Sequence, residues 1–560
     1  MSLLDSAAAH GVVVEATALH ALNRGEQLIV ARALLLEGWA WHNLGDNKSA
    51  VAVSLEAKAA YEAAGDRAGV ARAIHNLGLV SLQQGNLDGA EQQFKEALAI
   101  RRSIEDNQGI NRALGNLGRI REQRGDLEGS RKLYEESLAL ARKISDRGSV
   151  GMALGNIANI YISEGRPAEA RKYYEESLAL LREIGDKTGT AAVLANLGNL
   201  AFNAGDLDAA RKLYEESAAK FAEAGQKAGV AQIKALLAGL LYEQGDLASA
   251  KANYEQALAS AKDIGDPGTA SDAESGLCNV ARLQGDWTAA RAHGENAVAQ
   301  ARTAGDKKLL ANAFYGLSAV LLGKGDLAGV QKAASDGLAA AQESGDKDII
   351  ATGLYDSVAS AFYKGDYAEA QHAYEQALAF HRETKNSGAI AETQLALAEV
   401  ALEQQQAARA VILAEPAAAE LHHLKSSHLE ARAHLLLGRA ALQQRKIAQA
   451  QKSFAQATSL VSKSATPDQQ LEFAAWSARA NAAAGSGAES LKSFRASFSE
   501  LGPKAGVNVL FEARLALAEL TMKFGEASEG RTQLNALEKD ATEKSFSVFA
   551  RRAAAIRNSS

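Results

Sequence analysis

Apolar residues recur at spacings of three and four along most of this chain, which is the pattern of helices that bury one face. Residues 108 to 145 show it most clearly. Their pattern predicts a first helix from about Gln108 to Gln123 and a second helix from about Leu127 to Ile144. The same pair of helices recurs every 40 residues. A fixed period of this length predicts a solenoid of stacked helix pairs, which offers a long surface and usually no reaction centre.

Glycine and aspartate mark the ends of the predicted helices. A Gly just after a helix suits the left-handed backbone conformation at that point, and the Asp that often follows it can cap the next helix. One series of glycines falls inside the helix pairs, at Gly45, Gly85, Gly125, Gly165, Gly205, Gly245, Gly285, Gly325, Gly365, Gly485 and Gly525, and it fails at Gln405 and Arg445. A second series falls between the pairs, at Gly25, Gly65, Gly185, Gly225, Gly265, Gly305 and Gly345, with Glu105 and Ser145 as exceptions.

Small residues occupy matching positions of successive repeats, and we call such a set of matching positions a column. In the first helices, a small residue such as Gly118 usually follows a Leu or Ile such as Leu117. In the second helices, a small residue such as Ala170 is followed four residues later by an aromatic one such as Tyr174. Small residues let two helices approach closely, so a bulky residue there should overpack and cost about 1–3 kcal/mol.

Proline positions agree with this map in four cases out of five. Pro167, Pro267, Pro467 and Pro503 fall at or beside predicted loops, where the missing N–H costs little. Pro416 lies inside a predicted second helix, so we expect a kink or a break there.

The order of these columns resembles the tetratricopeptide repeat, whose common form has a period of about 34 residues. Forty-residue forms occur in kinesin light chains, in spindle adaptors that bind G-protein regulators, and in arrays appended to bacterial signalling kinases and transcription activators. The segments Ala113–Ile120 and Val193–Leu200 look especially similar to the adaptor type. The resemblance covers nearly the whole chain, and it is far more specific for fold than for function.

The fold class expected from pattern and resemblance is all-α, a right-handed superhelical solenoid of about thirteen antiparallel helix pairs. We expect a half repeat with only a second helix at residues 1–24 and a regular array at 25–384. A degenerate array at 385–545 and a closing helix with a tail at 546–560 should follow. Half a repeat cannot bury its face alone, so the chain would be a fragment or follow an upstream domain. An irregular N-terminal cap is the alternative.

Candidate binding residues lie on the first helices, because the resemblance implies that these helices line a concave groove. Asn can donate and accept hydrogen bonds, so a ladder of Asn can hold the backbone of an extended peptide, while Arg can pair with its carboxylates. Matching Asn and Arg positions are implied to hold extended peptides in the adaptor and kinesin families. The alternative is that the Asn side chains bond neighbouring helices. The candidates are Arg72, Asn76, Arg112, Asn116, Asn156, Asn159, Asn196 and Asn199.

Aromatic residues replace the Asn ladder further along the predicted groove. Tyr315 and Tyr355 are the candidates there for an apolar peptide site. The same stretch contains Phe202, Tyr242, Phe362 and Tyr363, and core packing is the alternative for the first three.

Composition and charge exclude several classes of function. The net charge of −6 includes no long run of like charges, so direct nucleic-acid binding is not expected. No apolar stretch is long enough to span a membrane, and no signal peptide is visible, so we expect a cytoplasmic location. His422, His423 and His428 fit no familiar zinc spacing, so no metal is expected. Cys278 falls in the small column, where a packing role is expected, and neither a cofactor nor a catalytic residue is predicted.

The function predicted from the sequence is a non-enzymatic scaffold that binds a peptide or partner segment in its concave groove. The alternative is a regulatory or sensory C-terminal region of a larger bacterial signalling kinase or transcription activator. A third possibility is self-assembly through an uncapped end of the array.

Overall fold

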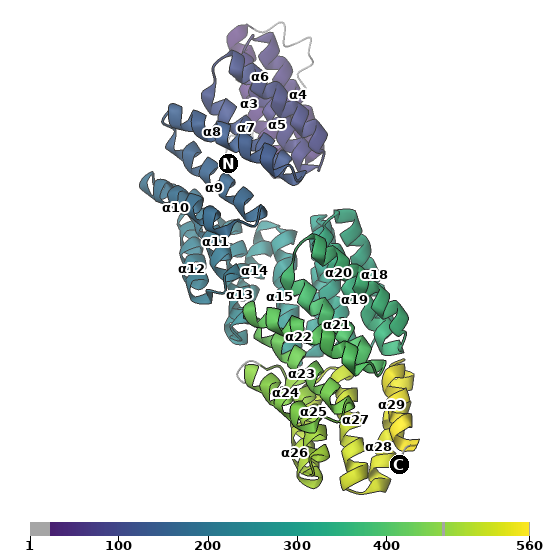
Figure 1. Cartoon of the computed structure of the whole chain (residues 1–560). Helices are drawn as coiled ribbons and strands as arrows, with labels where there is room; N and C mark the ends of the chain where they lie inside the picture. Colours follow the sequence, from purple (N-terminus) through teal and green to yellow (C-terminus); the bar gives the residue numbers. More distant parts are fainter. Residues whose placement is uncertain (1–22, 462–464, 559–560) are drawn as a thin grey trace. The chain divides into compact units, whose positions relative to one another are not determined.

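The computed structural model describes residues 23–461 and 465–558, and within these ranges the chain is helical throughout and contains no strand (Figure 1). It contains 27 α-helices, α3 to α29, and one 3₁₀ turn, η1. The chain divides into two compact units at Gly225/Gln226. We call them unit 1 and unit 2 and describe each by itself.

Unit 1 contains five helix pairs, and the first member of each pair has an odd number. The helices are α3 (Arg24–Asn43), α4 (Asn47–Ala63), α5 (Arg67–Gln83), α6 (Leu87–Ser103), α7 (Asn107–Gln123), α8 (Leu127–Lys143), α9 (Arg147–Ser163), α10 (Pro167–Glu183), α11 (Lys187–Asn203) and α12 (Leu207–Glu223).

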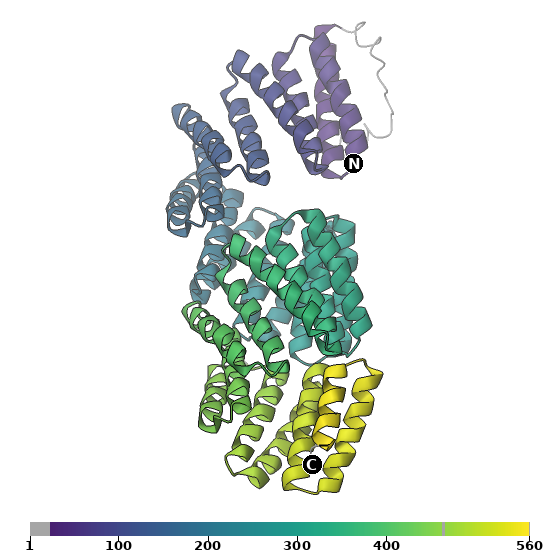
Figure 2. The same cartoon turned by 45° about the vertical axis from the view of Figure 1, so that its right-hand side comes forward.

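Unit 2 contains eight pairs and a closing helix, which Figure 2 shows in teal, green and yellow. In chain order, its helices begin with α13 (Lys227–Glu243), α14 (Leu247–Ile264), α15 (Pro267–Leu283), α16 (Trp287–Ala304), α17 (Lys307–Gly323), α18 (Leu327–Ser344), α19 (Lys347–Lys364) and α20 (Tyr367–Glu383). The rest are α21 (Ser387–Glu403), α22 (Ala407–His423), α23 (Ser427–Gln443), α24 (Ile447–Leu460), α25 (Pro467–Ala483), α26 (Gly487–Leu501), η1 (Gly502–Lys504), α27 (Val507–Phe524), α28 (Ala527–Glu543) and α29 (Ser547–Asn558).

Within each unit, consecutive helices pack as antiparallel pairs, and each pair packs on the next, as in a tetratricopeptide repeat array. The expected all-α repeat architecture is therefore confirmed. Thirteen pairs lie in the described part of the chain, the number that the 40-residue period predicted.

Each loop combines the end of one helix with the start of the next. Gly65 has φ +67°, and its N–H donates to the carbonyl of Glu62. The N–H of Asp66 closes the preceding helix on the carbonyl of Tyr61 at 2.9 Å. The carboxylate of the same Asp66 accepts the N–H of Gly69 at 3.0 Å and caps α5. Gly-Asp therefore ends one helix and starts the next, as the sequence indicated.

The loops that lack Gly keep the same left-handed backbone. Among residues 23–461 and 465–558, seven residues other than Gly have positive φ, and all seven stand in the register of the glycines. A left-handed conformation costs an L-residue about 1–2 kcal/mol, so the packing of the helices imposes these loops on the residues in them. The seven are Glu105, Ser145, Lys385, Gln405, Lys425, Arg445 and Ser545.

The start of the array differs from the prediction at Gly25. This residue was expected in a loop, but α3 begins at Arg24 and Gly25 lies in its first turn. Asn23 and Glu26 form a capping box, in which each side chain accepts the backbone N–H of the other, and this local cap starts the helix early. The half repeat predicted at residues 1–24 lies almost entirely outside the described residues.

Of the kink or break predicted at Pro416, the break does not occur, because α22 runs through this residue from Ala407 to His423. The proline leaves the carbonyl of Ile412, four residues earlier, without its usual helical donor. Ile412 is 72% exposed, so this turn of α22 lies at the surface, where a missing helical hydrogen bond costs less than in the core.

Small columns allow close contact inside each pair, as predicted. A Cβ atom on Gly118 would lie 2.5 Å from Cε1 of Tyr134, and one on Gly198 would lie 2.6 Å from Cε1 of Tyr214. Cys278 is buried in the same column, and burial raises the pKa of its thiol to about 11. These contacts fix the spacing between the two helices of a pair, and hence the positions of the side chains on the first helices.

Candidate functional site

The Arg and Asn columns of unit 1 lie on its first helices, and we call the side of α3, α5, α7, α9 and α11 that carries these columns the inner face. In this unit α3 packs on α5, α7 on α9, and α9 on α11. First helices that touch across repeats lie on the crowded, inner side of a curved stack. The candidate residues predicted from the sequence all belong to these helices or to α17 and α19 of unit 2.

The arginine column of the inner face is exposed. Arg72 lies 3.7 Å from Asp66 and stands over the Tyr61 ring, 5.5 Å from its centroid. Arg112, one repeat later, is exposed and has no ion pair or hydrogen bond within the described chain. Arg119, one helical turn beyond Asn116, is likewise exposed without such a partner in these ranges. The inner face of α5 and α7 therefore carries positive charge that the described residues only partly neutralise.

The first asparagine column is half-buried, and three of its four members bond neighbouring helices. The Asn76 amide donates to the carbonyl of Leu35 at 3.5 Å, and that of Asn196 donates to Asn159 at 3.3 Å. The amide nitrogen of Asn116 lies 3.4 Å from Nε2 of His75. Asn156 makes no side-chain hydrogen bond to any described residue. Packing thus accounts for part of the ladder, which is the alternative that the sequence left open.

The second asparagine column is tied to the aromatic column of the second helices. The Tyr174 hydroxyl donates to Oδ1 of Asn159, and the Tyr214 hydroxyl donates to Oδ1 of Asn199 at 2.6 Å. Each contact occupies the amide carbonyl and leaves the NH₂ group of the same side chain as a donor. Tyr and Asn therefore link the two helices of a pair directly beneath the inner face.

A buried cation that sequence reasoning missed lies under the arginine column. Arg101 is 2% exposed, donates to the carbonyl of Gly109 at 2.7 Å, and faces Nδ1 of His75 at 3.4 Å. Burial, followed by the charges of Arg101 and Arg112, lowers the pKa of His75 to about 3, so this imidazole is neutral near pH 7. In the 40-residue period, Arg101 matches Tyr61 and Leu181 of other repeats. A charged residue in a column of mostly apolar ones is the feature of the sequence that could have revealed it. It adds to the positive potential of the inner face.

The aromatic candidates of unit 2 do not form an open apolar groove. Tyr315 is only 6% exposed, and its hydroxyl donates to the carbonyl of Ile349 at 3.2 Å. Phe362 is buried, and Tyr363 packs against Phe546 of the chain's own C-terminal segment, with ring centroids 5.1 Å apart. Tyr355 is half-buried, and its hydroxyl accepts a hydrogen bond from Arg432 at 3.1 Å. The structure places this stretch in packed surroundings, because α29 lies against α19.

The inner columns of the last repeats carry opposite charges that pair with each other. Arg432 and Arg439 contact Glu399 at 3.1 and 3.2 Å. In the next repeats Arg479 pairs with Glu512 and Glu519, and Arg552 pairs with Glu512 at 2.7 Å. Burial alone would raise the pKa of Glu512, but Arg552 and Arg479 outweigh it and hold the pKa below its usual range. These columns match those of Arg72, Arg112 and Arg119 in unit 1. Arg72 pairs there with Asp66, but Arg112 and Arg119 have no ion pair with any described residue.

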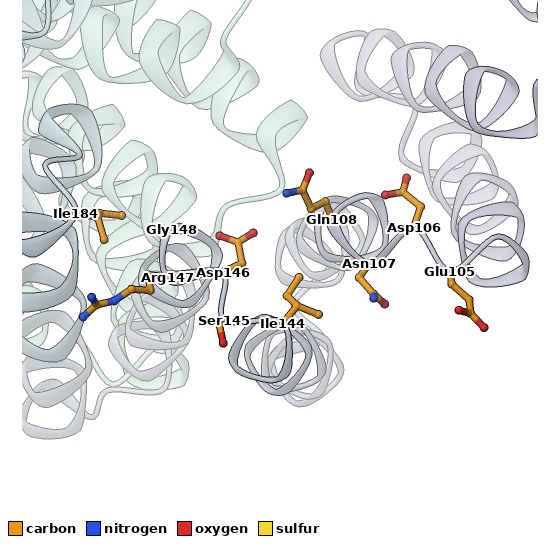
Figure 3. A pocket seen from close by; sticks show the side chains of 10 residues that line it. All are labelled: Glu105, Asp106, Asn107, Gln108, Ile144, Ser145, Asp146, Arg147, Gly148 and Ile184. Atoms are coloured by element: carbon orange, nitrogen blue, oxygen red, sulfur yellow. The ribbon is translucent and has the colours of Figure 1, made fainter.

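A wide depression lies along the loops of unit 1, away from these columns (Figure 3). Its lining comes from the loops before α7 and α9 and from Ile184. The carboxylates of Asp106 and Asp146 are occupied there as helix caps, accepting the N–H groups of Gly109 and Ser149. Arg147 pairs with Glu183. The polar groups of this depression thus serve the local helices.

Other signals in the sequence lead to no reactive centre in the described ranges. No group of three or more His, Cys, Asp or Glu side chains that could hold a metal ion occurs among the residues described. His422 faces Glu430 at 3.0 Å, and His428 faces Gln469 at 3.2 Å. None of the described helices is long and apolar enough to cross a membrane.

The fold and the inner face define an α-helical repeat scaffold. Models of the tetratricopeptide repeat match residues 31–103, 109–183, 187–263 and 435–504, which together make up more than half of the 560 residues. The chain belongs to the tetratricopeptide repeat family. Repeats of this family indicate a scaffold for protein–protein interaction, and no catalytic domain is evident in the sequence.

Comparison with solved structures gives distant similarities, and no curated protein matches the sequence. BtubC (BKLC) from P. vanneervenii is 19% identical, with 44% of this chain and 93% of that chain covered and a TM-score of 0.33. The apo form of RapI is 15% identical, with coverages of 42% and 85% and a TM-score of 0.36. A signal transduction ATPase with numerous domains and a tetratricopeptide repeat sensor, from Pyrococcus horikoshii, is 16% identical, with coverages of 60% and 53% and a TM-score of 0.44.

Proposed function

We propose that the inner face of unit 1 binds an extended, acidic segment of a partner protein, and that the chain acts as a non-enzymatic scaffold. The observation that carries this proposal is the contrast between the two ends of the array. The inner columns pair their own charges at Arg432, Arg479 and Arg552, whereas Arg112 and Arg119 have no such partners among the described residues. Exposed cations without partners attract and orient carboxylates.

The asparagine side chains supply the second part of the proposed recognition. Asn156 has both its donor and its acceptor free of described partners, and Asn159 and Asn199 keep NH₂ groups beside it along the array. An extended peptide presents a carbonyl and an N–H at every residue, so amide side chains can hold it whatever its sequence. The arginines would then select peptides that carry acidic residues at matching positions.

The experiment uses the full chain and a random library of displayed peptides. Peptides selected on the wild-type chain should be rich in Asp and Glu, and their binding should weaken as salt rises, because the charges involved are exposed. The Arg112→Ala/Arg119→Ala chain should bind them at least about tenfold more weakly, or about 1.4 kcal/mol. Arg171→Ala/Lys172→Ala removes the same charge from exposed positions on α10 and should leave binding unchanged.

Asn156→Ala tests the amide contacts most cleanly. Its side chain bonds no described residue, so its loss should weaken peptide binding without lowering the melting temperature. Replacing Asn116, Asn196 and Asn199 as well should abolish binding, but these changes also remove contacts with His75, Asn159 and Tyr214. Peptides that bind the arginine and Asn156 variants as tightly as the wild type would refute the proposed site.

A further inference from the structure

A small chamber in unit 2 is lined by residues of α17, α19, α20, α21 and α23. Its volume is about 190 Å³. Aromatic rings form much of its wall: Tyr355 and Tyr374 lie with ring centroids 5.1 Å apart, and Phe362 and Tyr363 meet edge to face at 5.2 Å. The faces of such rings carry negative potential, which attracts cations.

The arginine in the chamber wall is fully engaged by neighbouring groups. Arg432 contacts Glu399 at 3.1 Å and donates to the Tyr355 hydroxyl at 3.1 Å. Glu399 is shared with Arg439, which also pairs with Glu403 at 2.7 Å. Arg432 and Glu399, the two of these charged groups that line the chamber, therefore neutralise each other.

The Asp356 carboxylate also lines the chamber and has no hydrogen bond or ion pair to any described residue. Burial, followed by the charge of nearby Glu392, raises the pKa of Asp356 to about 7. Glu392 likewise has no ion pair or hydrogen bond in the described ranges. Arg432 offsets part of the charge of Glu392, but the Asp356 carboxylate in the chamber wall has no paired cation among the described residues. A buried charge in this state is costly, and a cation beside it would remove the cost.

We propose that this chamber binds a small organic ammonium cation, with Asp356 as its counter-ion and the Tyr355, Phe362, Tyr363 and Tyr374 rings as an aromatic enclosure. An anion would face the uncompensated carboxylate, and a neutral apolar ligand would leave that carboxylate unpaired. Aromatic walls favour an organic cation, since ring faces attract ammonium groups by about 0.5–2 kcal/mol each in desolvated sites. This site is independent of the peptide-binding face proposed for unit 1.

Titration calorimetry on the full chain tests the proposal, with choline and ethanolamine as quaternary and primary ammonium probes. At least one probe should bind with a Kd of about 1 mM or lower and raise the melting temperature. The neutral isostere of choline, in which a tert-butyl group replaces the trimethylammonium group, should bind at least about tenfold more weakly. No binding of either cation at about 10 mM would overturn the proposal, as would equal binding of the neutral isostere.

Asp356→Asn keeps the shape of the side chain and removes its charge, so the variant should fold and lose at least about tenfold in cation affinity. Glu369→Gln removes one charge at an exposed position of α20 and should bind as the wild type does. Circular dichroism of both variants establishes that they fold. A folded Asp356→Asn chain that binds the cation with wild-type affinity would overturn the assignment of Asp356 as the counter-ion.

Discussion

Four consecutive loops of unit 2, at residues 385 to 445, place an L-residue where the backbone favours glycine, and replacing these residues with glycine should stabilise the unit. Lys385, Gln405, Lys425 and Arg445 have φ of 57°, 62°, 55° and 60°. Their side chains are exposed and make no hydrogen bond or ion pair with the described residues, so their removal costs no contact there. The change in folding stability on replacement with glycine then depends only on the backbone conformation.

The magnitude follows from two opposing terms. A left-handed conformation costs an L-residue about 1–2 kcal/mol, while glycine loses about 0.5–1 kcal/mol more than other residues in backbone entropy on folding. Each change to Gly should therefore gain about 0.5–1 kcal/mol, and four changes in separate loops should add to about 2–4 kcal/mol.

The assay must resolve local stability, because a solenoid of this length need not unfold in one step. Amide hydrogen exchange in α21 to α24 should slow by about thirtyfold or more in the four-glycine variant, where 1.4 kcal/mol corresponds to tenfold. As a control, Lys452→Gly at an exposed position inside α24 should speed local exchange, at a cost of about 1 kcal/mol. Unchanged or faster exchange in the four-glycine variant would refute the claim that packing imposes these loops.

Three further predictions concern packing, capping and charge. Gly118→Ala should destabilise unit 1 by about 1–3 kcal/mol in thermal unfolding, because its Cβ would lie 2.5 Å from Tyr134. Gly115→Ala lies on the same helix with open space around it, so in the same assay it should be neutral or stabilising. Asp126→Ala removes the cap that accepts the N–H of Gly129 at 2.9 Å and should lower the free energy of unfolding in urea by about 1 kcal/mol. Equal stability of the variant and the wild type would contradict this. Burial, then neighbouring Glu399, raises the pKa of Glu472 to about 7, so its charge opposes folding increasingly as pH rises from the ordinary value towards 7. Glu472→Gln should therefore stabilise unit 2 by about 1–3 kcal/mol near pH 8 and make little difference near pH 4; an equal effect at both values would contradict this.

The sequence could predict the helix pairs because one register governs both the loops and the small columns. The end and start of neighbouring helices depend on adjacent residues such as Gly65 and Asp66. The close contact of Gly118 with Tyr134 joins two positions that the period already places on facing helices. Gly25 was misjudged because a local capping box at Asn23 overrode the register. The break at Pro416 was not avoided in the prediction because only the structure shows that Ile412, whose carbonyl loses its donor, is exposed.

The functional residues could be predicted less completely, since their partners depend on packing between repeats. The Asn and Arg columns were visible in the sequence, but the bonds of Asn116 to His75 and of Asn159 to Tyr174 were not. The paired charges from Glu399 to Arg552 could have been found by reading the same columns to the end of the chain. The chamber around Asp356 could not, because it needs α17 and α23, which lie far apart in sequence.

The central claim, that the inner face of unit 1 holds an extended acidic peptide, is tested most directly by site-specific photo-cross-linking. Met152 stands in the column of Arg72 and Arg112 on α9 and is 57% exposed, so a photoreactive side chain can replace it without disturbing the core. A selected acidic peptide should cross-link to the chain that carries the photoreactive group at position 152 and not to one that carries it at Lys172, an exposed position on α10. Cross-linking at position 172 alone, or equally at both positions, would contradict the account.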